Sequence, residues 1–141
     1  MNYQKTNQSY LIRLNLGEEL MQTLTQFCVD KKIKAGFFVG IGAALTAEIG
    51  LYILDKKEYE FQKFKAPLEI LNLTGNITLI DNKPFLHVHT TLSDKNFKAI
   101  GGHVKELIVG PTCEIHLSVF EKKVSRKLDE EIGLKLMDLE K

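Results

Sequence analysis

Arginine is scarce in this sequence. Lysine and arginine together number 19, but only Arg13 and Arg126 are arginine, and the formal net charge is +1. Arginine reads guanine edges and phosphates through paired hydrogen bonds, so the chain is poorly equipped for direct readout of bases. An Arg-Gly-Arg-Pro hook for the minor groove is absent. The near-neutral charge also gives no net attraction to phosphate backbones or anionic membranes.

Cysteines and the common catalytic motifs are equally sparse. Cys28 and Cys113 lie far apart within apolar patterns, and we expect both to be reduced core residues. The sequence has no internal repeat, no phosphate-binding loop and no serine or cysteine nucleophile motif. Residues 40–45 faintly resemble a dinucleotide fingerprint, but its third glycine is missing and a strand pattern follows. Nucleotide binding is therefore disfavoured.

The chain lacks any segment that predicts a membrane span. Its most apolar stretch, residues 35–54, contains Glu48 and four glycines and predicts two buried strands instead. The polar residues 1–5 do not resemble a signal peptide, so we expect a cytoplasmic protein. Length and composition predict one domain over residues 1–141, with its core at about 9–120 and a C-terminal extension at 121–141.

Most segments of the sequence show the alternation that is typical of β-strands. Residues 9–16 predict a first strand, and apolar residues at helical spacing predict an amphipathic helix of about fifteen residues from Gly17. Further strand patterns lie at 56–64 (a solvated arm or edge strand), 68–80, 85–92 and 112–120, with turns at 81–84 and at Gly110 and Pro111. Residues 129–139 predict a short helix or a cover for a sheet edge. The pattern indicates the α+β class with a mostly antiparallel sheet.

Three of the four histidines lie close together in the sequence. Alternate side chains of a strand share a face, so His87 and His89 project together. A polar turn after this strand predicts a hairpin that returns His103 toward them. His103 pairs with His87 on one face if the loop has an odd number of residues. A three-residue loop at 94–96, with Asn96 left-handed, or a bulge at Gly101 and Gly102 would satisfy this.

Three neutral imidazoles form an open coordination sphere. Such a set suits Zn²⁺ and leaves one position for water or a substrate atom. The alternative is three partly exposed histidines that bind nothing. Glu69, Glu114 and His116 are candidates for supporting the metal ligands or lining a ligand pocket, as acids or bases, while no catalytic residue is assigned. For His116, pairing with a carboxylate or another subunit is favoured over a role as fourth ligand or proton shuttle.

Together these motifs resemble the PPC ("plants and prokaryotes conserved") domain. The similar segments lie between about Tyr10 and Phe120 and include Arg13 with Gly17-Glu18, residues 38–43, residues 67–77, His87-Val88-His89, Gly101-Gly102-His103 and Thr112-Cys113-Glu114. The resemblance implies a compact antiparallel sheet flanked by helices, a homotrimer, and a zinc site at the three histidines. Plant members carry AT-hooks and regulate through DNA, which implies DNA as a partner by family association. The metal ligands alone are similar to those of acetolactate decarboxylases.

Three functional hypotheses follow. The first is a metal-binding homotrimeric PPC-domain protein with a DNA-associated or regulatory role. The second is a small metal-dependent enzyme of the lyase or hydrolase type, which uses the open three-histidine zinc site on a small-molecule ligand. The third is a structural trimer whose histidines hold no metal. The residues alone leave all three open, and with them the question of enzymatic activity.

Overall fold

Strands make up most of the protein. The computed structural model describes residues 1–140, which hold one α-helix and nine strands: β1 (Asn2–Thr6), β2 (Ser9–Asn15), α1 (Leu20–Asp30), β3 (Gly36–Ile53), β4 (Glu58–Phe64), β5 (Leu68–Ile80), β6 (Lys83–Ser93), β7 (Ala99–Val119), β8 (Ser125–Asp129) and β9 (Leu134–Asp138), with a 3-10 turn η1 (Leu54–Lys56). The predicted α+β class, with helices flanking the sheet, is therefore wrong. The fold is mostly β: α1 is the one α-helix of residues 1–140, and the C-terminal segment, where a second helix was one expectation, pairs as strands.

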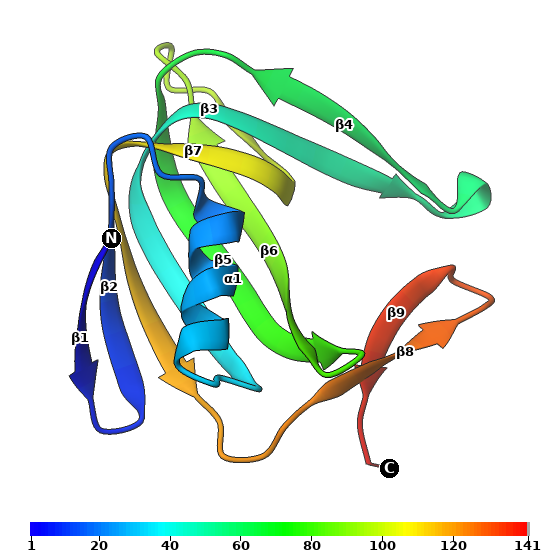
Figure 1. Ribbon diagram of the computed structural model, residues 1–141. Coiled ribbons are helices and arrows are strands. Elements are labelled where there is room, and N and C mark those ends of the chain that lie inside the picture. Colours follow the sequence, from blue (N-terminus) through cyan, green and yellow to red (C-terminus); the bar gives the residue numbers. More distant parts are fainter. Residues whose placement is uncertain (141) are drawn as a thin grey trace.

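The strands form a single sheet that closes on itself (Figure 1). β3 pairs with both β5 and β7, and β6 pairs with the same two strands, so these four strands make a ring. All four pairings are antiparallel, as predicted. Alternation along each strand then sends one set of side chains into the ring and the other set outward.

β3 and β7 are longer than the sequence suggested. Residues 35–54 were predicted as two strands, and a turn was predicted at Gly110 and Pro111, yet both β3 and β7 run without interruption. Their pairing shifts register at Gly42, whose φ is +152° and whose position would bring a Cβ onto the Thr112 carbonyl oxygen. Local irregularities thus bend these strands around the ring where we expected breaks.

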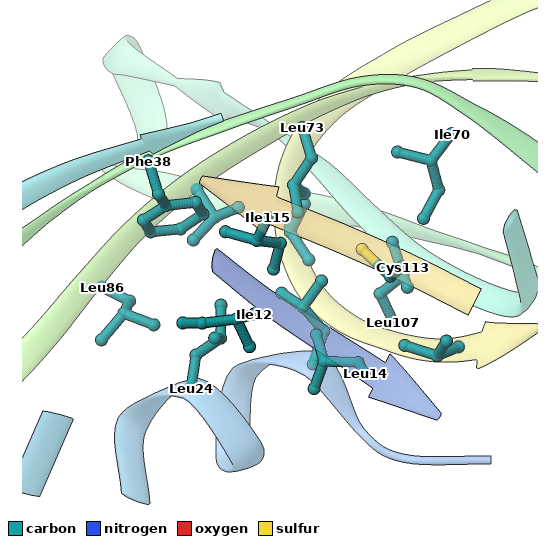
Figure 2. Close-up of a cluster of buried hydrophobic side chains, with 14 of the residues drawn as sticks. Ile12, Leu14, Leu24, Phe38, Ile70, Leu73, Leu86, Leu107, Cys113 and Ile115 are labelled. Carbon is teal, nitrogen blue, oxygen red and sulfur yellow. The ribbon is translucent and has the colours of Figure 1, made fainter. Parts of the chain in front are cut away.

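Helix α1 packs against the core of the ring. It begins at Leu20, later than predicted, because the Glu19 carboxylate caps it by accepting hydrogen bonds from the backbone N–H groups of Met21 and Gln22. Figure 2 shows Leu24 of α1 beside Ile12 and other buried core side chains. Both cysteines are free and buried, as predicted. No helix in the described residues has the length and apolar character to cross a membrane.

The C-terminal extension forms a β-hairpin where a short helix was one expectation. β8 and β9 pair antiparallel, and Gly133 takes a φ of +80° in the turn between them. The hairpin contacts the β3–β4 arm, since the Tyr52 hydroxyl donates to the Ile132 carbonyl (2.7 Å) and Lys57 Nζ donates to the Glu130 carbonyl (2.7 Å). Lys141, the last residue of the predicted extension, lies outside the described residues.

Candidate metal centre

The β6–β7 hairpin brings the three histidines together. Ser93 pairs with Ala99, so the loop spans residues 94–98, and the ladder continues regularly to a direct pair between His89 and His103. The predicted three-residue loop is wrong, and so is its partner assignment of His87 with His103. The loop length is nevertheless odd, which keeps His103 on the face of His87 and His89 without a bulge at Gly101 and Gly102.

Asp94 explains the longer loop. Its Oδ1 accepts hydrogen bonds from the backbone N–H groups of Asn96 (2.8 Å) and Lys98 (2.9 Å). These bonds, with the Lys98 bond contributing most, lower the pKa of Asp94. The residue in the left-handed region is Phe97, with φ of 60°, and not Asn96. The Asp94 side chain therefore stabilises a five-residue loop through hydrogen bonds to the backbone of that loop.

His87, His89 and His103 form a histidine triad. Their imidazole nitrogens converge on one point outside the ring of strands. One ligand nitrogen from each of His87, His89 and His103 lies within 4.8 Å of the others. The Nε2 atoms of His87 and His89 are 3.2 Å apart. Two nitrogens bound to one tetrahedral zinc at about 2.1 Å would lie roughly 3.4 Å apart. The spacing of His87 and His89 therefore matches two zinc ligands, and His103 supplies a third imidazole nitrogen within 4.8 Å of them.

Burial keeps His103 neutral. Its Nδ1 is buried and has no hydrogen-bond partner among residues 1–140. Burial is the largest cause that lowers the pKa of His103 to about 4, followed by the charges of His87 and His89. Burial, His89 and Arg126 likewise lower the pKa of His87. Because metals bind the neutral imidazole, these two rings are in the ligand form at neutral pH, and the unpartnered nitrogen fits a ligand role.

Metal-free protein is expected to lose stability as the pH falls from about 6.5 to about 4. The unfolded chain protonates His103 near the ordinary histidine pKa of 6.5, whereas the folded ring does so only near its pKa of about 4. Protonation therefore favours the unfolded state through this window, by at most about 3 kcal/mol. Urea denaturation of chelator-treated protein across this pH range measures the loss. His103→Gln should reduce it, and an equal loss in both proteins would contradict this origin.

Aromatic side chains flank one side of the triad. The Tyr59 ring lies 4.6 Å from the His103 ring and is stacked on Phe61 at 5.4 Å, centroid to centroid. Burial is the largest cause that raises the pKa of Tyr59. Both aromatics come from β4, which pairs with β3 as the predicted arm. No role was predicted for Tyr59 and Phe61 from the sequence, although strand alternation places both side chains on one face.

The other predicted site residues lie elsewhere. Glu114 and His116 share a face, as predicted, but they line a groove of about 730 Å³ between β2 and β3 that contains no triad histidine. Glu69 is exposed and pairs with Ser93 at the loop end of β6. Within residues 1–140, none of Glu69, Glu114 and His116 forms a hydrogen bond with a triad histidine. Their supporting role stays a prediction.

Solved structures share this fold along its whole length. A protein named "Putative DNA-binding protein" from Ralstonia eutropha JMP134 is 34% identical, with a TM-score of 0.91 and coverage of 98% of this chain and 96% of that chain. A metal-containing protein from Archaeoglobus fulgidus is 33% identical, with a TM-score of 0.88 and coverage of 99% of both chains. Each name describes that protein alone.

Acetolactate decarboxylase from Bacillus subtilis strain 168 is a more distant relative in fold. It is 12% identical, with a TM-score of 0.57 and coverage of 89% of this chain and 58% of that chain. At this identity the likeness concerns the fold alone. No curated protein matches the sequence significantly. A family model, that of the Plants and Prokaryotes Conserved (PCC) domain, matches residues 1–121. The chain therefore belongs to the PCC domain family, which is the PPC domain that its motifs resemble.

Proposed function

We propose that this protein binds a divalent metal, with zinc as the best fit, through His87, His89 and His103. The observation that carries the proposal is the convergence of their ring nitrogens within 4.8 Å. The name of the metal-containing relative from Archaeoglobus fulgidus supports it. A bound zinc would supply Lewis-acid character at the open side of the triad. That open side also supports the alternative function, a small metal-dependent enzyme of the lyase or hydrolase type.

Metal content tests the proposal directly. Untagged protein, purified without chelator, should contain about one zinc per chain by elemental analysis, as a single three-histidine site requires. Protein stripped with chelator should regain the same amount from a zinc buffer. A folded protein that takes up no zinc, cobalt or manganese under these conditions would contradict the proposal and would support the metal-free structural hypothesis.

We further propose that residues 1–141 form a single domain that assembles as a homotrimer. Exposed apolar side chains in the groove between β2 and β3 support a subunit contact there, with Leu11, Val39 and Ile41 exposed by 51%, 43% and 60%. The number three comes from the family resemblance. Light scattering on purified protein should give three times the mass of one chain, and a monomer at micromolar concentration would contradict the proposal.

A DNA-associated role is the second candidate, and the name of the Ralstonia eutropha relative favours it. The presence of only two arginines and a net charge of +1 predict weak binding carried by lysines. The protein should retain duplex DNA in a gel at ~50 mM salt and lose it steeply as salt rises. If it shows no retention at that salt, DNA is not its partner.

A further inference from the structure

Arg126 of the C-terminal hairpin lies against the sheet beside the triad. Its side chain is half-buried and makes three hydrogen bonds: Nε to the Thr78 hydroxyl (2.8 Å), Nη1 to the Lys135 carbonyl (2.9 Å) and Nη2 to the Asn76 side-chain oxygen (2.9 Å). The guanidinium carbon also lies 5.0 Å from the centre of the Phe85 ring. Hydrogen bonds and packing thus fix its position.

The strand register places this guanidinium next to His87. Asn76 pairs directly with His87, and Thr78 pairs with Phe85. Directly paired residues and alternate residues share a face, so these four side chains point outward together with the triad. Arg126 contacts Asn76, Thr78 and Phe85. Because Asn76 pairs with His87, the arginine lies at the His87 edge of the triad.

The charge of Arg126 has no anionic partner in the described part of the chain. All three acceptors are neutral, and no carboxylate of residues 1–140 forms a salt bridge with it. A guanidinium has five N–H donors, so one N–H on each terminal nitrogen is left over. A half-buried cation without a counter-charge is costly, and paired terminal N–H groups suit a carboxylate.

We propose that Arg126 binds a carboxylate of a small anionic ligand whose other end reaches the metal on the triad. The proposal rests on the proposed metal site and adds the ligand class, a small carboxylic acid with a second oxygen donor. The metal and the guanidinium would then hold the two ends of one molecule, which fixes its orientation. Arg126 lies beyond residues 1–121, so the match to the family model does not include it.

Cobalt-loaded protein tests the proposal, with succinate as the probe. Co²⁺ in the triad gives a visible spectrum that reports changes in its ligands, and succinate should alter that spectrum saturably. Arg126→Gln should lower the affinity for succinate about 10-fold or more, as expected for the loss of a charge-assisted pair. It should leave the affinity for cobalt unchanged. Asn76→Ala, which removes the hydrogen bond that holds Nη2 of Arg126, should lower the affinity for succinate by a smaller factor.

Two matched variants separate recognition from support of the hairpin. Lys127→Gln removes a neighbouring exposed cation from β8, and Lys57→Met removes the bond to the Glu130 carbonyl that also holds the hairpin. Both should bind succinate like the parent protein. Equal succinate binding by Arg126→Gln and the parent, or no spectral change in the parent, would overturn the inference and leave the metal site standing. Failure of cobalt to bind the folded parent protein would instead overturn the proposed function.

Discussion

His103→Ala is expected to abolish tight zinc binding while the protein stays folded. Partners outside the first coordination sphere commonly contribute about 10–100-fold to metal affinity, so loss of one of three direct ligands should cost more than about 100-fold. The substitution loses the packing of the imidazole against Tyr59 but no hydrogen bond of the buried Nδ1, so the protein should stay folded. Competition with a chromophoric zinc chelator measures the affinity, and circular dichroism checks the fold.

His116→Ala is the matched control, since His116 is the one histidine of the sequence outside the triad. It should bind zinc like the parent protein, because it lies in the separate groove with Glu114. His89→Ala should behave like His103→Ala. If the His116 variant loses zinc and the His103 variant keeps it, the metal ligands have been assigned wrongly.

Gly75→Ala is expected to destabilise the protein by about 1–3 kcal/mol through overpacking. A Cβ at this position would run into Cζ of Phe38 and lie 2.8 Å from its Cε1 and 2.9 Å from the His87 carbonyl oxygen. Phe38 is 1% exposed, so its ring has no open space to move into. Urea denaturation of parent and variant, both stripped of metal, measures the change in the free energy of unfolding.

A second substitution tests whether Phe38 is the cause. Phe38→Leu removes the atoms that the new methyl group would meet, so Gly75→Ala should cost about 1 kcal/mol less in that background than in the parent. Thr91→Ala, an exposed change on β6, should alter stability by less than about 0.5 kcal/mol. Identical costs in both backgrounds would show that the strain arises from the backbone contact with His87.

Local rules predicted the core of the candidate site. Strand alternation alone put His87 and His89 on one face, and parity alone required an odd loop to add His103. Neither rule gives the loop length, because that depends on the hydrogen bonds of Asp94 to Asn96 and Lys98. The predicted pairing of His103 with His87 was therefore wrong, but the prediction that His103 shares a face with His87 and His89 is confirmed.

Local sequence patterns could not predict the contacts between segments that are distant in the chain. Arg126 reaches the triad only because β8 folds back beside β5, and the charged pattern of residues 129–139 favoured a helix or an edge cover equally. The N-terminal strand β1 was missed because its polar residues are all exposed and give no burial pattern. The fold class was wrong for the same reason: pairing across the sheet, and not local propensity, decided the last strands.

The attachment of the C-terminal hairpin also separates its motions from those of the ring. Only the pair Leu79–Ser125 joins β8 to β5 as a ladder, supported by a hydrogen bond from Leu79 N–H to the Val124 carbonyl (2.8 Å). The ring strands, in contrast, are paired along most of their lengths. The hairpin can therefore open at a lower free energy than global unfolding. Amide hydrogens of β8 and β9 should exchange with solvent well before those of β5 and β6.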